Sequence, residues 1–180
     1  MLISMAREGN NLRAFSFCTL ERIGGTPCVL LGCASVKRTS KRDAVLRALM
    51  TDQFRRAVLA FPDEDVLVGT RFAGASGYEA FKNLEDIVPR PDHKATGEER
   101  AWGRRLAKRF GADGRIDDRT FVVTGDGCES GGFDFISPKA AAGSEECAFF
   151  EGVDAAAGGR LVTFGWALAE DLAGGKLGGR

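Results

Sequence analysis

Residues 27–34 read PCVLLGCA, a continuous apolar run that ends in small residues. A run this short, with β-branched Val29 inside it, is typical of a strand buried on both faces of a parallel sheet. Residues 65–72, DVLVGTRF, form a second such run, and residues 119–124, RTFVVT, form a third. Weak alternation over residues 12–20 indicates another strand before them. We therefore expect a mainly parallel sheet at the centre of the fold.

Helical patterns lie between the apolar runs. Apolar residues three and four apart predict a helix that Thr51 caps and that ends near Phe61. A capping box at residues 76–79 predicts a short helix, and a second at residues 96–99 predicts a longer one that stops at Gly111. Alternating strands and helices favour the α/β class, here a three-layer α/β/α fold.

Length and composition favour one globular domain. The chain has 180 residues, of which 44% are hydrophobic and 28% are charged, and this excludes a disordered or fibrous protein. We expect a single domain over residues 1–173 and a flexible glycine-rich tail over 174–180. Residues 147–151 and 160–166 suit either strands or short helices. No apolar run reaches the length of about 18 residues that a membrane span needs, so no membrane partner is expected.

Positive charge is concentrated in one segment. The whole chain has a net charge of 0, but residues 1–61 hold ten Lys and Arg against four Asp and Glu. Most of the excess lies directly after the first apolar run, at Lys37, Arg38, Lys41 and Arg42. This segment is either a solvated surface run or a phosphate-binding loop.

The cysteines indicate a reduced, cytoplasmic protein without a metal or cofactor. Their number is odd, no two are spaced C-x-x-C, the N-terminus has no apolar signal segment, and the chain has one histidine, His93. Cys33 ends an apolar run, where a core position is commoner than a nucleophile. A four-cysteine iron–sulfur site from Cys28, Cys33, Cys128 and Cys147 is the alternative.

Polar side chains follow each predicted strand. Ligands of open α/β sheets bind beyond the carboxyl ends of the strands. A single cleft is therefore expected from Cys33, Ser35, Lys37 and Arg38 after the first run, Arg71, Phe72 and Tyr78 after the second, and Asp126 after the third. Asp126 also suits a simple turn, Tyr78 suits packing under its loop, and His93, in PRPDHK, suits a solvated side chain.

Several sequence motifs are absent. The chain has no Walker A sequence, no G-x-G-x-x-G after the first strand, no G-x-S-x-G and no zinc-deaminase signature. These absences disfavour ATP hydrolysis, dinucleotide binding, serine hydrolysis and deamination.

Residues 28–61, CVLLGCASVKRTSKRDAVLRALMTDQFRRAVLAF, resemble small bacterial and phage domains that look related to the uracil-DNA glycosylase superfamily. The matching features are Cys33 at the end of a buried strand, Lys37 four residues on, and the segments 44–49 and 51–54. The likeness extends over about residues 27–110. After the second strand this chain has GTRFAG, where family members often have Ser-Ala-Lys-Tyr-Gly.

The resemblance implies a DNA glycosylase, which flips a base out of DNA and excises it. Lys37, Arg38, Lys41 and Arg42 then suit the phosphates, and Phe72 or Tyr78 suits stacking on the base. Asp126 suits water activation or stabilisation of the sugar cation, with Glu129 and Asp92 as other candidate carboxylates, and His93 suits assistance to the leaving base. Gly69, Gly74 and Gly77 suit a large modified base, as in anti-phage defence. An enzyme of free nucleotides or nucleosides and a non-catalytic nucleic-acid-binding module are the alternatives.

Overall fold

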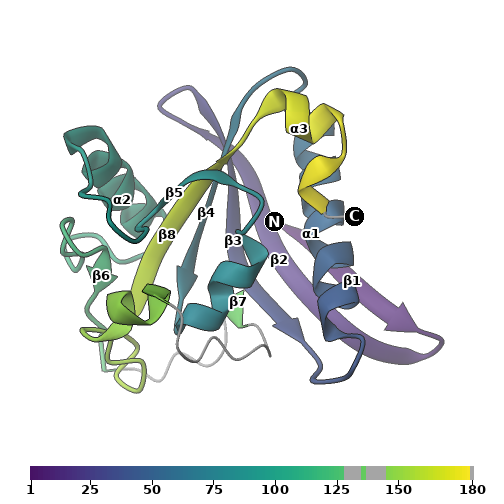
Figure 1. The fold of residues 1–180 in the computed structure, drawn as a ribbon, viewed down its shortest axis with the longest axis horizontal. Helices are drawn as coiled ribbons and strands as arrows, with labels where there is room; N and C mark the ends of the chain where they lie inside the picture. Colours follow the sequence, from purple (N-terminus) through teal and green to yellow (C-terminus); the bar gives the residue numbers. More distant parts are fainter. Residues whose placement is uncertain (128–134, 137–144, 179–180) are drawn as a thin grey trace.

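The chain begins with an antiparallel three-stranded meander, seen in the computed structural model of residues 1–127, 135–136 and 145–178 (Figure 1). Its strands are β1 (Leu2–Glu8), β2 (Asn11–Ile23) and β3 (Thr26–Val36). Gly24 and Gly25 alone join β2 to β3, with φ angles of 60° and 90°. A two-residue hairpin turn requires this left-handed backbone, which glycine adopts without strain.

The remaining elements supply the other strands of the sheet and the helices that pack on it. In chain order they are α1 (Arg42–Ala60), β4 (Val66–Phe72), η1 (Ala75–Ala80), β5 (Glu85–Val88), α2 (Gly97–Arg109), β6 (Val122–Val123), β7 (Phe135–Ile136), η2 (Glu145–Phe150), β8 (Arg160–Ala167), α3 (Ala169–Ala173) and η3 (Lys176–Gly178).

The α/β class is confirmed, but the prediction of a mainly parallel sheet is wrong. The strand order is β1-β2-β3-β7-β4-β8-β5, and β6 also pairs with β8. Among the strands that the structure describes, only the pairs among β3, β4 and β7 are parallel. Strand β8 runs antiparallel to β4 along its whole length. A fully buried strand is apolar in either orientation, so the apolar runs at 27–34 and 65–72 could not reveal the direction of their neighbours.

Helix α1 begins at Arg42, nine residues before the predicted cap. The Thr51 hydroxyl instead donates to the carbonyl of Arg47 within the helix, at 2.8 Å. Gln53 of α1 is fully buried. Its amide joins α1 to the meander, because it donates to Ser16 at 2.7 Å and to Ser4 at 3.1 Å. The Cys18 thiol donates to the Gln53 carbonyl oxygen.

Two apolar cores cover the two faces of the sheet. On one face, Leu46, Leu49, Met50, Phe54 and Ala57 of α1 pack with Val29, Leu31, Val68 and Phe72 of the sheet. On the other, Trp102, Leu106 and Ala107 of α2 pack with Leu30, Leu67, Val162 and Phe164. Figure 1 shows α1 beside the meander and α2 near β5 and β8.

Helix α2 begins and ends where local signals predict. Thr96 and Glu99 form the predicted capping box. At the other end, Gly111 has a φ of 73°, and the amides of Gly111 and Ala112 donate to the carbonyls of Lys108 and Ala107. These bonds make a Schellman motif, which satisfies carbonyls that the last helical turn leaves open.

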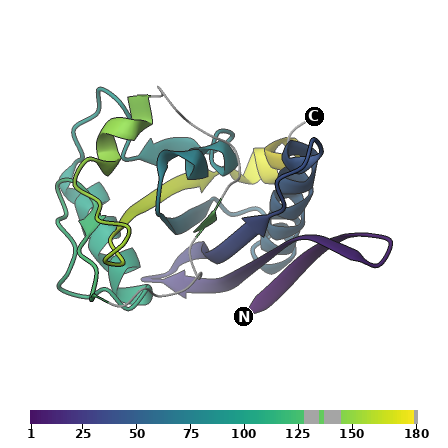
Figure 2. The same cartoon turned by 90° about the horizontal axis from the view of Figure 1, so that it is seen from below.

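The C-terminal third adds strands within the sheet, since β7 lies between β3 and β4 and β8 lies between β4 and β5 (Figure 2). Of the predicted strand 119–124, only β6 forms, and it pairs antiparallel with β8. Residues 160–167 are strand β8, whereas 145–150 form a 3₁₀ helix. Within the expected tail, Leu177 is buried against the α1 core. No helix among the described residues is long and apolar enough to cross a membrane.

Candidate functional site

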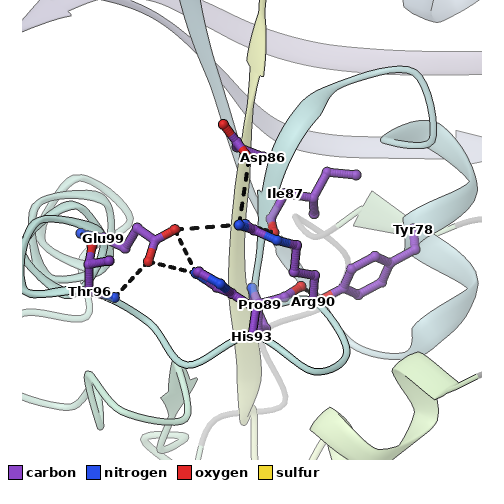
Figure 3. Close-up of polar contacts among 8 residues, drawn as sticks. All are labelled: Tyr78, Asp86, Ile87, Pro89, Arg90, His93, Thr96 and Glu99. Atoms are coloured by element: carbon purple, nitrogen blue, oxygen red, sulfur yellow. Dashed lines mark hydrogen bonds and ion pairs between the residues drawn. The ribbon is translucent and has the colours of Figure 1, made fainter.

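The loop that joins β5 to α2 places His93 beside the start of the helix (Figure 3). At the strand end of the loop, the Tyr78 hydroxyl donates to the carbonyl of Pro89 at 3.0 Å. Arg90 donates to the carbonyl of Ile87 at 3.0 Å. At the other end, Thr96 caps α2. Both ends of the loop are therefore held, and His93 is positioned between them.

His93 and Glu99 form a close polar pair. The Nε2 atom of His93 lies 2.9 Å from each carboxylate oxygen of Glu99. Arg90 adds a guanidinium 3.7 Å from the same carboxylate. An ionised carboxylate can only accept hydrogen bonds, so Nε2 of His93 carries the hydrogen. Nδ1 is then the ring nitrogen that can exchange a proton with a ligand.

Glu99 is ionised at neutral pH. Burial acts to raise the pKa of its carboxyl group, but hydrogen bonds from Thr96 and His93 outweigh this effect and hold the pKa below the ordinary value of 4.5. The Thr96 amide, for example, donates to Glu99 at 2.7 Å. The Glu99 side chain thus both completes the capping box with Thr96 and pairs with His93, which couples the geometry of His93 to the start of α2.

His93 lines a pocket of about 630 Å³ at the interrupted edge of the sheet. Strands β5 and β6 both pair with β8 but at different places, with Val88 opposite Phe164 and Val122 opposite Leu161. Residues of η2 and the turn after it cover the interval between them. The other polar side chains in the lining are Asp117, Arg119, Thr120, Thr124 and Glu151, and the aromatic ones are Phe121 and Phe149.

A strained backbone holds the loop 117–122 at this pocket. Phe121 has a φ of 62°, which is an outlier for so bulky a residue. The left-handed conformation costs roughly 1–2 kcal/mol. It persists because the Phe121 amide donates to the Asp117 carbonyl at 2.7 Å and the Val162 amide donates to the Phe121 carbonyl at 2.9 Å. The loop therefore presents Asp117, Arg119 and Thr120 to the pocket in a defined arrangement.

The predicted stacking rings lie in the protein interior. Phe72 is fully buried, and Tyr78 packs against it with ring centroids 5.3 Å apart. Burial raises the pKa of Tyr78 well above its usual range, so its hydroxyl stays a donor to Pro89. Gly69 and Gly77 likewise serve packing, because a Cβ atom would lie 2.9 Å from Leu106 and 2.2 Å from Phe72 respectively. Neither glycine leaves space for a base.

The basic loop lies at the opposite edge of the sheet from His93. Lys41 forms an ion pair of 2.6 Å with Glu8 of the β1–β2 hairpin, and the Lys37 amide donates to the Arg13 carbonyl at 2.9 Å. Arg42 lies 3.7 Å from Asp43, and Arg38 is exposed. A separate pocket of about 420 Å³ lies between loop and hairpin. The expected single cleft is therefore divided.

Asp126 and Arg71 both lie near Arg115 and outside the lining of the His93 pocket. Arg115 lies 3.4 Å from the Asp126 carboxylate, and its charge helps lower the pKa of Arg71, after the larger effect of burial. The Arg71 guanidinium lies over the Phe110 ring, 5.1 Å from its centroid. Ser35 is half-buried on β3, where it pairs with Ile136.

Three of the four described cysteines are buried, and Cys147 is exposed. Burial raises the pKa of Cys18 and of Cys28 to about 11, and it also raises the pKa of Cys33. Within residues 1–127, 135–136 and 145–178, no group of three or more His, Cys, Asp or Glu side chains is placed to hold a metal ion. Cys128 and Glu129 lie outside the described residues.

Comparison with protein-family models, with curated proteins and with solved structures gives no match for this chain. The resemblance to the glycosylase superfamily therefore stays a prediction, and the site is interpreted from its own geometry.

Sequence reasoning missed Glu99, Asp117 and Arg119. Glu99 was visible as the fourth residue of the capping box at 96–99, and its distance of six residues from His93 was the available signal. Asp117 and Arg119 carried no comparable signal, because β6 and β8 bring their loop to the pocket.

Proposed function

We propose that the protein is an N-glycosidic-bond hydrolase that removes a base from DNA, with the His93 pocket as its active site. The observation that carries this proposal is the His93–Glu99 pair on the wall of a pocket that also holds the carboxylate of Asp117. Hydrolysis of an N-glycosidic bond needs a proton for the leaving base and a negative charge beside the sugar, and these groups can supply both.

In the proposed reaction, His93 starts as an imidazolium with a proton on each ring nitrogen. The C1′–N bond breaks and its electron pair passes to the base, which takes the proton from Nδ1 of His93. The sugar becomes an oxocarbenium-like cation that the Asp117 carboxylate stabilises. A water molecule then forms a bond to C1′, and its proton passes to Asp117. The products are the free base and an abasic sugar. Glu99 acts through His93 by keeping its ring orientation and tautomer.

The size of the pocket supports a substrate of one flipped nucleotide. Pockets for small ligands usually measure about 300–1,000 Å³, and this one is about 630 Å³. That volume suits a base with an added group, as in modified phage DNA. The Phe149 side chain takes the stacking role first expected of Phe72 and Tyr78.

An enzyme that hydrolyses free nucleotides is the second candidate. It is favoured by one observation, namely that the pocket and the basic loop lie at opposite edges of the sheet. A free nucleotide needs only the His93 pocket, whereas a DNA strand can contact the pocket and the basic loop together.

The test incubates the purified protein with unmodified, uracil-containing and phage-modified DNA, followed by alkali cleavage at abasic sites. Parallel reactions with nucleotides and nucleosides are analysed for free base. We expect His93→Gln to lower the rate of base release by about 100- to 10,000-fold. Lys94→Gln is the matched control, because Lys94 is an exposed neighbour outside the pocket lining. Absence of base release from every substrate would contradict the proposal.

A further inference from the structure

The turn at residues 117–119 fixes the backbone of Arg119 at the rim of the His93 pocket. The Arg119 amide donates to Oδ1 of Asp117 at 2.9 Å, and the Asp117 amide donates to the Val122 carbonyl at 2.9 Å. Together with the strained Phe121, these bonds leave the loop little freedom. The backbone of Arg119, from which its side chain extends, is consequently held in place before any ligand binds.

The Arg119 guanidinium differs from its neighbours in having no partner among the residues that the structure describes. Arg104 is paired with Asp118, and Arg90 is paired with Glu99 and with Asp86. For Arg119, no side-chain hydrogen bond or ion pair is formed with any residue that the structure describes. Asp118, the adjacent acid, is engaged by Arg104. Arg119 is thus an uncompensated cation on the lining of the largest of the described pockets.

We propose that Arg119 binds a phosphate group of the substrate, so that the enzyme takes nucleotides, free or within a strand, and rejects nucleosides. The inference rests on the proposed function for the nature of the base and sugar. It adds that the substrate must carry a phosphate ester next to the sugar whose bond is broken. A guanidinium offers paired N–H donors that match two phosphate oxygens, and this geometry suits Arg119 better than a lysine.

The side chains on the pocket lining offer a separate partner to each part of a nucleotide. His93 and Arg119 lie on the same pocket lining, together with Asp117 and Glu151. Arg119 anchors the phosphate at the rim while His93 meets the base, which fixes the sugar between them near Asp117. Binding at two points orients the glycosidic bond. A nucleoside is held only by its base and lacks the second point of binding.

The test measures binding rather than activity. The four deoxynucleoside 5′-monophosphates, the matching nucleosides and inorganic phosphate are titrated by calorimetry against the wild-type protein, Arg119→Gln and Arg55→Gln. Arg55 is exposed on α1 and loses the same charge away from the pocket. We expect at least one monophosphate to bind about 10- to 100-fold more tightly than its nucleoside, the usual gain from a hydrogen bond to a charged group. Arg119→Gln should abolish this difference, and Arg55→Gln should keep it.

The outcomes separate this inference from the proposed function. If nucleosides and monophosphates bind equally to the wild type, or if Arg119→Gln keeps the difference, the role of Arg119 is refuted while base release can still occur. If His93→Gln abolishes base release and the phosphate preference is intact, both proposals stand. If neither class of compound binds to the wild type, the phosphate assignment is overturned, and the base-release assay decides separately on the hydrolase.

Discussion

Nε2 of His93 lies 2.9 Å from both carboxylate oxygens of Glu99, and the same carboxylate closes the capping box of α2. One side chain therefore serves both the stability of a helix and the orientation of the candidate proton donor. This double role makes the pair testable by stability and by activity.

Glu99 should make the protein less stable in acid. Its pKa is lowered in the folded state, so it contributes stability that is fully present above the unfolded value, ordinarily 4.5, and is lost as the pH falls through the lower folded value. At pH 7 we expect Glu99→Gln to lower the free energy of unfolding by about 1 kcal/mol, because a hydrogen bond to a charged group is worth about that much more than a neutral one. The difference in free energy of unfolding between the wild type and Glu99→Gln should narrow below pH 4.5. Urea unfolding at several pH values measures it, and a gap independent of pH would refute the role.

Asp117 and Asp126 are competing candidates for the catalytic carboxylate. Asp117 lines the His93 pocket, whereas Asp126 lies 3.4 Å from Arg115 outside that lining. Asp117→Asn should lower the rate of base release by at least about 100-fold, the effect of removing one preorganised electrostatic group. Asp126→Asn should leave the rate nearly unchanged. Single-turnover measurements decide, and the reverse result would restore Asp126 as the catalytic residue.

Gly103 of α2 packs closely against Phe121, which lines the pocket. A Cβ atom there would lie 2.7 Å from the ring of Phe121, the strained residue of the 117–122 loop. Gly103→Ala should therefore lower the free energy of unfolding by about 1–3 kcal/mol, the cost of overpacking. Gly97→Ala, at the open first turn of α2, should be neutral or stabilising by up to about 1 kcal/mol. Equal effects of both changes on thermal unfolding would contradict the contact.

Only Cys147 among the described cysteines should react quickly in the native protein. The thiolate is the reactive form, and a thiol with a pKa of about 11, as in Cys18 and Cys28, is ionised only to about 0.1% at pH 8. Cys147 is exposed. Iodoacetamide labelling followed by peptide mass spectrometry measures this. Rapid labelling of Cys18, Cys28 or Cys33 without denaturant would show that the core opens.

The basic loop should contribute to DNA binding without affecting base release from a free nucleotide. Lys37 and Arg38 are exposed, and Lys41 is held by Glu8. Changing Lys37, Arg38 and Lys41 to Ala should weaken binding to any DNA sequence and flatten the salt dependence by about 0.9 per lost phosphate contact. Arg55→Ala is the control for loss of charge. An unchanged salt slope would leave the loop as a solvated surface run.

Local signals in the sequence determined α2, β4 and the core position of Phe54 and Ala57. The capping box at Thr96 and Glu99 and the stop at Gly111 involve residues a few positions apart, so the chain needs no distant partner to specify them. The hairpin signal Gly24–Gly25 was equally local, and it would have indicated an antiparallel start of the sheet.

Only the tertiary structure decided the strand directions and the site. β8 pairs with β4 across about a hundred residues, with Val66 opposite Ala167, and no periodicity within either strand encodes that choice. Strand β8 also pairs with β5 and with β6. This pairing places His93, Asp117 and Arg119 around a single pocket. Their proximity arises from hydrogen bonds between distant segments, which no spacing along the chain records.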